Sequence, residues 1–393
     1  MEVEKLNLIG DPWIPVCNAA DGASRQVSLT ELFRDAEAIA DLDVPPPQRV
    51  ALMRLLLAIT HRALNGPRDE AEWRAARGRI QPAALAYLES MTSKFELYGP
   101  GAFLQADELE QLDNAALSKL DFTLAAGNSH TVWDHLATTA RNYPPAWQAL
   151  MLLAYQNLSP GGRIGVGKWC GKPTAGGGSS SAAPALEGSP LHLFLLGGNL
   201  LETIHLNLID SERSKVAFGV PVWEKAPAGP DDTGDFLRSY CGRLAPFSRA
   251  IKLSQDSPML TLANGFSYPQ LPDFVDPLLA KKRNPKDDTV SYLRLNPDKH
   301  PWRELAAILA TRSDDGTVSP ALNLLNRNRL ADDRIVTIWC GGVAVDKAKF
   351  EFIGEWRFAF EVGTITSDGG VGLLRNEILL AEESANALKS AIT

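Results

Sequence analysis

The sequence contains few of the residues that build metal centres and disulfide frameworks. Its four cysteines are isolated, so none has the CxxC spacing of a zinc ribbon: Cys17, Cys170, Cys241 and Cys340. Isolated cysteines fit a reducing compartment better than a disulfide scaffold, and we therefore expect a cytoplasmic protein. The six histidines include no HExxH pattern. The sequence predicts no metal site, no cofactor and no catalytic residue.

Long apolar runs are also missing. The most apolar stretch, residues 50–64, contains Arg54, His61 and Arg62, which makes it too short and too charged to cross a bilayer. The first residues do not combine a basic segment with an apolar run, so they do not resemble a signal peptide. We expect no membrane partner.

Positive charge is in deficit. Lysine and arginine number 39 against 47 aspartate and glutamate residues, and the formal net charge is −8. Binding to a phosphate backbone needs clustered cations, so this composition does not favour a protein that binds nucleic acid alone. Any such contact must come from local basic patches or be shared with partner subunits.

Helical and strand patterns occupy separate stretches, which predicts the α+β class. A length of 393 residues favours two or three domains. Ser28 and Glu31 have the spacing of a capping box at the start of a helix. We expect helices at 29–33, 48–64, 68–91, 145–158 and from about 372 to the end, and strands at 191–208, 335–339 and 343–360.

Residues 161–186 are the most unusual part of the chain, with eight glycines, three basic residues and no acid. Gly162–Lys168 matches the GxxxxGK core of a phosphate-binding loop, but Trp169 stands where the magnesium-binding Ser or Thr should be. A helix-like segment also precedes it in place of a buried strand, so ATP binding is disfavoured. Two interpretations stay open. The segment is a plain surface loop, or its backbone and cations approach nucleic acid closely, because glycine lacks a Cβ.

Several short segments, taken in order, resemble the CasA family, the large subunit of the type I-E CRISPR Cascade surveillance complex. They span essentially the whole chain: 6–16 (LNLIGDPWIPV), 51–63 (ALMRLLLAITHRA), 95–105, 222–224, 248–253 and 301–305. The resemblance implies a mixed α/β domain over 1–365. It also implies that 366–393 begin a C-terminal helical region, where the family's four-helix bundle is truncated or replaced.

The resemblance also implies a task. Such a subunit is not catalytic, and it joins crRNA with the backbone, crRNA-end-capping and small subunits. It recognises the protospacer-adjacent motif in double-stranded DNA, starts strand separation and helps to recruit the helicase-nuclease, while guide pairing reads the target sequence.

Site residues follow from the same resemblance. The glycine loop maps to Gly161, Gly162 and Arg163, within a glycine-rich loop at about 160–188. A lysine of the DNA groove maps to Lys252, and a wedge maps to Asp346, Lys347 and Ala348 in a hairpin at about 341–360. A mobile loop near the crRNA end maps to Asn128, Trp133 and His135. Lys168 and Lys172 are possible phosphate contacts.

Plainer interpretations stand beside these. Lys252 could be a solvated lysine on an edge strand, Asp346-Lys347 a simple turn and Trp133 a core residue. Two other functions compete with motif recognition. One is a nucleotide-binding enzyme using Gly162–Lys168, and the other is a scaffold that only bridges subunits.

Overall fold

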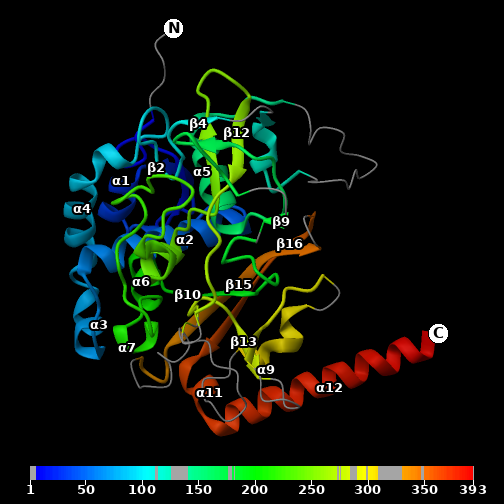
Figure 1. Ribbon diagram of the computed structural model, residues 1–393. Coiled ribbons are helices and arrows are strands. Elements are labelled where there is room, and N and C mark those ends of the chain that lie inside the picture. The colour runs from blue at the N-terminus through cyan, green and yellow to red at the C-terminus, as the bar shows by residue number, and fades with distance from the viewer. Residues whose placement is uncertain are drawn as a thin grey trace.

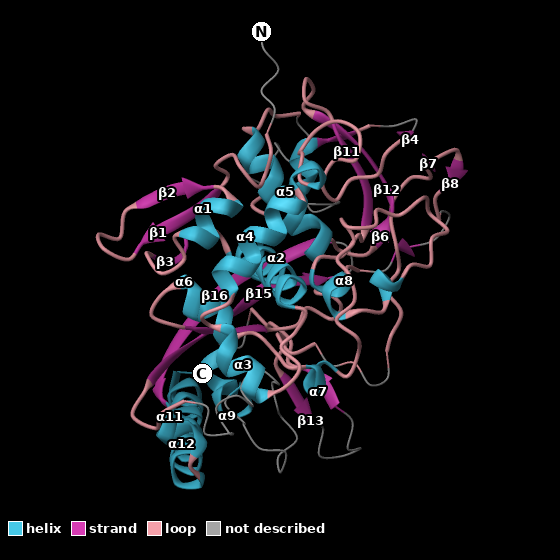
Figure 2. Ribbon diagram, turned by 90° about the vertical axis from the view of Figure 1, so that its left-hand side faces the viewer, coloured by secondary structure: helices cyan, strands magenta, loops and turns pink. Residues whose placement is uncertain are grey.

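A computed structural model describes residues 6–110, 114–124, 140–175, 179–180, 182–271, 274, 276–283, 290–297, 300–308, 330–346 and 349–392. Small antiparallel sheets surround a group of buried helices (Figures 1 and 2). This mixture confirms the predicted α+β class. No helix in these ranges is long and apolar enough to cross a membrane.

The N-terminal sheet has the order β2-β1-β3, formed by β1 (Ile14–Asn18), β2 (Ser24–Val27) and β3 (Ile39–Leu42). Helix α1 (Leu29–Arg34) begins where the sequence predicts. The Ser28 hydroxyl accepts a bond from the Glu31 backbone N–H, and the Glu31 carboxylate accepts one from the Ser28 N–H. Both bonds satisfy donors that a helix start leaves open, which confirms the capping box.

Helix α2 (Pro46–Leu64) is the centre of the molecule. It packs against α4 (Ile80–Ser90), α5 (Pro145–Leu158) and α8 (Tyr240–Leu244). Because neighbours cover it on all sides, even its Arg49, Arg54 and His61 are buried. Figure 2 shows α2 and α5 between the N-terminal sheet on one side and β11 and β12 on the other.

The single helix expected at 68–91 is wrong. The chain forms α3 (Glu70–Ala76) and then α4, with a break that contains Gly78. Glycine weakens a helix, and Pro82 is tolerated in the first turn of α4, where no intrahelical donor is needed.

The remaining short strands form four small sheets. Three strands have the order β11-β12-β5, and three more have the order β4-β7-β8, while β6 pairs with β9 and β13 with β14. Their bounds are β4 (Leu109–Glu110), β5 (Ala115–Ala116), β6 (Gly162–Arg163), β7 (Lys168–Trp169), β8 (Lys172–Pro173), β9 (Ser179–Ser180), β11 (Arg249–Leu253), β12 (Met259–Asn264), β13 (Lys281–Arg283) and β14 (Val290–Tyr292).

A long hairpin dominates the C-terminal part. Strands β15 (Ile335–Asp346) and β16 (Lys349–Glu361) pair along their whole length, and β10 (His192–Leu196) adds to β15. Strands were expected to continue to 208, and this is wrong. Helix α6 (Leu200–Leu206) follows β10, because the Asn199 side chain accepts a bond from the Glu202 N–H and caps a helix there.

The hairpin leads directly into helices at the C-terminal end. β16 is followed by α11 (Val362–Thr366) and by the long α12 (Asp368–Ile392), which extends away from the body in Figure 1. The described ranges also contain two short helices, α7 (Ser211–Ser214) and α9 (Leu305–Ile308). Single 3-10 turns lie at Thr92–Lys94, Leu117–Leu120, Asp235–Leu237 and Pro301–Glu304.

Candidate nucleic-acid interface

The glycine loop begins directly where α5 ends. Gly162 has φ of +132°, a backbone conformation that side chains strongly disfavour, so glycine is required there. Gly162 and Arg163 pair with Ser180 and Ser179 of β9. Gly161 and Gly162 are half-buried, and Arg163 is exposed. The loop therefore presents backbone and one cation at the surface.

The segment Gly162–Lys168 does not have the arrangement of a phosphate-binding loop. Such a loop needs a helix that starts at the lysine, but Lys168 opens the short strand β7 and pairs with Glu110. Trp169 is buried and stacks on Phe247 with ring centroids 5.4 Å apart. Gly167 serves packing, because a Cβ there would lie 2.9 Å from the Glu110 carbonyl oxygen. This geometry disfavours a nucleotide site here.

The two lysines predicted as phosphate contacts differ in their surroundings. Lys168 is exposed. The Lys172 Nζ lies 2.8 Å from Asp231 Oδ2, and this bond lowers the pKa of Asp231. Because a carboxylate already partners its charge, Lys172 is the weaker candidate.

Lys252 lies on β11, at the edge of its sheet, and is exposed. The stretch 254–259 looks inserted relative to the family and makes the register of Lys252 uncertain by a few residues; in the structure, residues 254–258 form the turn between β11 and β12. The edge position fits both interpretations, a solvated lysine and a groove contact.

A buried polar bracket joins β11 to the glycine loop. The Gln156 side chain on α5 accepts a bond from the Arg249 N–H (2.9 Å) and donates one to the Arg249 carbonyl (2.8 Å). The Arg249 guanidinium donates to the carbonyl of Pro160, the residue just before the loop, at 2.7 Å. Both side chains are buried. The strand that carries Lys252 is thus fixed to the start of the glycine loop.

The hairpin end is held near the same helix. Asp346 is exposed and pairs with Lys349, while Lys347 and Ala348 lie outside the described residues. The Ser189 hydroxyl accepts a bond from the Val345 N–H at 3.0 Å. Phe350 contacts the ring of Phe122 at 4.6 Å between centroids, and Phe122 contacts Tyr155 of α5 at 6.2 Å. The end of the hairpin is therefore packed rather than free-standing.

The middle of the hairpin is fixed to α2 and β3. Trp339 is fully buried, and its indole N–H donates to Glu355 on the paired strand. Arg49 of α2 lies over the Trp339 ring, 5.8 Å from its centroid, and donates to Asp41 at 2.6 Å. Arg357 of the hairpin donates to the same carboxylate at 2.9 Å. One carboxylate thus ties two arginines from different elements together.

Gly341 makes this packing possible. A Cβ at that position would lie 2.6 Å from the Gly354 carbonyl oxygen and 2.8 Å from the Trp339 ring. The strand therefore has room for the indole only because residue 341 has no side chain.

Helix α5 collects these elements. Its C-terminal end leads into the glycine loop, Gln156 holds β11, and Tyr155 contacts the Phe122–Phe350 pair at the hairpin end. Sequence reasoning missed Gln156, Arg249 and Ser189, because their partners are 89 to 156 residues away. It also missed Arg49, whose bond to Asp41 belongs to no local motif. Asn128, Trp133 and His135 lie outside the described residues.

Metal-ligating side chains do not gather in the described ranges. They contain no group of three or more histidine, cysteine, aspartate or glutamate residues that could hold an ion. All four cysteines are free.

The features above define a class, an α+β protein in which a glycine loop, the edge strand β11 and the end of a long hairpin are all attached to helix α5. A family model described as CRISPR-associated protein Cse1 matches residues 7–393. A CRISPR-associated protein CasA/Cse1 from Thermus thermophilus is 31% identical over 98% of this chain and 77% of its own length.

Solved structures agree. Cse1 of Thermobifida fusca has a TM-score of 0.75 at 25% identity, over 92% of this chain and 74% of its own. A chain of a CRISPR RNA-guided surveillance complex has a TM-score of 0.77 over 98% of this chain and 81% of its own, and at 20% identity it shows the shared fold alone. The chain belongs to the CRISPR-associated Cse1 family, also called CasA, and this confirms the resemblance.

Proposed function

We propose that the chain is the large, non-catalytic subunit of a type I-E CRISPR surveillance complex. In this proposal it recognises the protospacer-adjacent motif in double-stranded DNA, starts strand separation beside it and helps to recruit the helicase-nuclease. Its partners are crRNA and the backbone, crRNA-end-capping and small subunits. Family membership supports the assignment to such a complex, since a chain with this fold is part of a surveillance complex.

The observation that carries the DNA role is the attachment of three surface elements to α5. The glycine loop follows α5, β11 with Lys252 is bonded to Gln156, and the hairpin end packs on Tyr155 through Phe122. A rigid support matters because a duplex must meet all its contacts in one register. The chain is acidic overall, but these elements carry the exposed cations Arg163 and Lys252.

Each element has a distinct role in the proposal. The glycine loop brings backbone N–H groups close to the minor groove, where the absence of a Cβ allows close approach. Lys252 supplies a cation to the groove. The hairpin end, Asp346 to Ala348, occupies the space left when the first base pair parts, which costs about a few kcal/mol of stacking and pairing.

The hairpin role is tested by strand-opening kinetics. In the assembled complex, Asp346→Gly with Lys347→Gly should leave assembly intact but slow the opening of a closed linear duplex, followed with a fluorescent base analogue. A target with a pre-melted bubble beside the motif should restore the rate. Opening of closed duplex at the wild-type rate would refute the wedge role, and a bubble that gives no rescue would assign these residues to binding or assembly.

A mobility shift separates motif recognition from a purely scaffolding role. The assembled complex is given duplexes that differ only in the flanking motif. We expect a clear affinity difference that Gly162→Ala reduces, because alanine cannot adopt the backbone of Gly162 without strain. Equal affinity for all motifs would favour the scaffold.

A further inference from the structure

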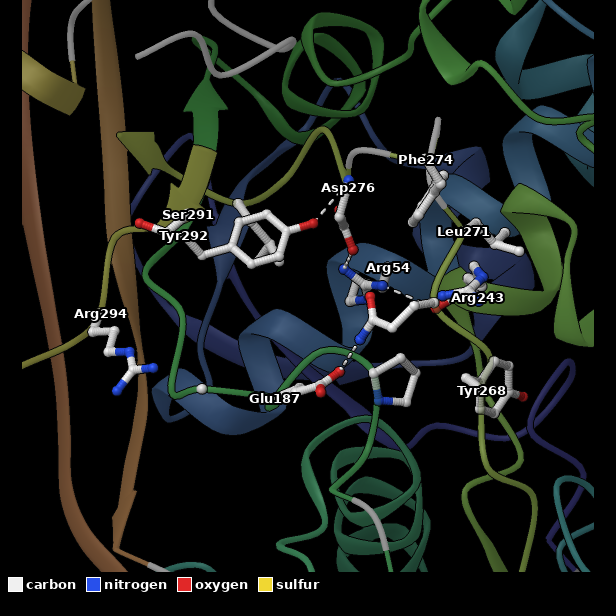
Figure 3. A pocket seen from close by; sticks show the side chains of 14 residues that line it. Arg54, Glu187, Arg243, Tyr268, Leu271, Phe274, Asp276, Ser291, Tyr292 and Arg294 are labelled. Atoms are coloured by element: carbon white, nitrogen blue, oxygen red, sulfur yellow. Dashed lines mark hydrogen bonds and ion pairs between the residues drawn. The ribbon is translucent and has the colours of Figure 1, made fainter. Parts of the chain in front are cut away.

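A polar cavity of about 330 Å³ lies between α2, α8 and β14. Figure 3 shows it with Asp276 and Tyr292 on one side, Glu187 on the other, and Arg54 and Arg243 along one wall. Its size is that of a small-ligand site. None of the individual site residues that the resemblance assigns lines it, although Pro184, Glu187 and Gly188 at the end of the glycine-rich loop do.

A buried ion pair forms one wall. Arg54 Nη1 donates to Asp276 Oδ2 at 2.9 Å, and the two side chains are 1% and 7% exposed. Arg54 Nη2 donates to the Arg243 carbonyl, and Asp276 Oδ1 accepts the Leu278 N–H. The carboxylate of Asp276 is therefore fully engaged by groups that belong to the fold.

Two more buried cations lie around this pair. The Arg243 guanidinium lies over the rings of Phe274 and Tyr268, at 5.2 and 5.7 Å. Lys281, 6% exposed, lies 5.8 Å from the centroid of the Tyr292 ring. Burial lowers the pKa of Arg243, and it lowers that of Lys281 to about 8. The Arg243 guanidinium also donates to the Pro269 carbonyl, which is a neutral partner, and no ion pair joins Arg243 or Lys281 to a described carboxylate.

The carboxylates among the described lining residues do not balance these charges. Among the described lining residues, Asp276 is the one buried carboxylate, against the buried cations Arg54 and Arg243, with Lys281 beside them. Glu187 is exposed and accepts a bond from the Gln270 amide at 2.7 Å. Buried charges normally have a partner, so the described part of the lining carries an excess of positive charge.

An available cation stands at the rim. Arg294 is exposed, and no hydrogen bond or ion pair joins it to another described residue. Figure 3 shows it across the cavity from Arg243. A guanidinium is well suited to phosphate, because its fork of N–H donors matches two oxygens.

The cavity also lies next to the hairpin end. Gly188 lines it, and the following residue, Ser189, bonds Val345 just before the tip. A strand released at the hairpin would therefore emerge close to the rim.

We propose that this cavity binds a phosphate-bearing nucleotide unit, with Arg294 as the contact at the rim and Arg243 deeper inside. Two sources share this chemistry, a free mononucleotide and one nucleotide of an unpaired DNA strand. The position beside the hairpin favours the strand, and that choice rests on the proposed function.

Binding to the purified full chain tests the proposal. The probes are inorganic phosphate and thymidine monophosphate by calorimetry, and a fluorescein-labelled hexathymidylate by anisotropy. Arg294→Ala should weaken binding about tenfold, the loss of one charge-assisted contact. Leu271→Trp enlarges a lining side chain without changing charge and should weaken binding at least as much. Arg79→Ala removes an exposed arginine on α4's N-terminal side and should leave binding unchanged.

The probes distinguish a free mononucleotide from a nucleotide of an unpaired strand. Equal or better binding of the mononucleotide points to a free nucleotide, and binding of the hexamer alone points to a strand. The proposal is overturned if no probe binds the wild-type chain. It is also overturned if Leu271→Trp has no effect or if Arg79→Ala matches Arg294→Ala, since binding would then be general surface attraction. Motif discrimination by the assembled complex is a separate measurement, so a failure here leaves the proposed function untouched.

Discussion

Replacing Arg249 with lysine should release the glycine loop from the strand that carries Lys252. Arg249 bonds two carbonyl oxygens at 2.7 Å, those of Ser248 and Pro160, and a lysine ammonium on a thinner stem cannot hold both in this fork geometry. A buried hydrogen bond from a charged donor is worth about 1.5–3 kcal/mol. We therefore expect Arg249→Lys to lower the free energy of unfolding by about 2 kcal/mol in a urea titration.

The functional consequence is a loss of discrimination rather than of all binding. We expect the ratio of affinities for duplexes with and without the motif to fall about tenfold, which corresponds to about 1.4 kcal/mol. Arg62→Lys is the matched control. Arg62 bonds Glu224 at 2.6 and 3.0 Å, away from the glycine loop, and being one-third exposed it should cost only about 1 kcal/mol. If Arg249→Lys keeps the wild-type ratio, or if Arg62→Lys reduces it as strongly, the bracket does not position the interface.

Three further outcomes are expected. Asp276→Asn leaves Arg54 buried without its counter-charge and should cost about 3–5 kcal/mol of unfolding free energy in urea, and a loss below about 1 kcal/mol would contradict this. Burial holds the pKa of His61 at about 4 and of His192 at about 3, below the ordinary 6.5, so their contribution is complete above pH 6.5 and is lost as the pH falls. Urea titrations between pH 7 and 4 should then show a decline of up to about 1.4 kcal/mol per pH unit for each histidine, and a flat profile would refute it. Arg163→Ala should weaken duplex binding and lower the salt slope by about one unit, whereas Lys172→Ala, whose charge Asp231 already partners, should change little in the same anisotropy titrations.

Elements with local signals were predictable. The capping box at Ser28 and helix α5 at 145–158 follow from residue types and spacing. The strand pattern at 335–360 was recognised, but its bounds were wrong, because β15 continues through 340–342 to Asp346 and β16 begins at Lys349. The single helix predicted at 68–91 and the strand predicted to continue to 208 were wrong, because each prediction ignored a local signal. Gly78 marks the break between α3 and α4, and Asn199 with Glu202 marks the start of α6, which apolar residues alone made look like a strand.

The residues that hold the interface and the cavity in place bond to partners far away in the sequence, so no short segment of sequence contains both partners. Arg54 meets Asp276 across 222 positions, and Arg249 meets Pro160 across 89. A buried arginine is also unusual enough that composition alone would place it on the surface. The resemblance could point to the surface residues of the interface, but the residues that hold them in place became visible only in three dimensions.

The glycines of the hairpin have a consequence for anyone who wishes to re-engineer the protein. A Cβ at Gly341 would lie 2.8 Å from the Trp339 ring, and one at Gly354 would lie 2.6 Å from the Phe352 ring, so this section has no spare volume for substitution. Asp346, in contrast, is exposed at the end of β15. The hairpin thus combines glycine positions that have no room for a side chain with an exposed Asp346 at the end of β15, which makes Asp346 the natural position for a library that seeks altered strand opening.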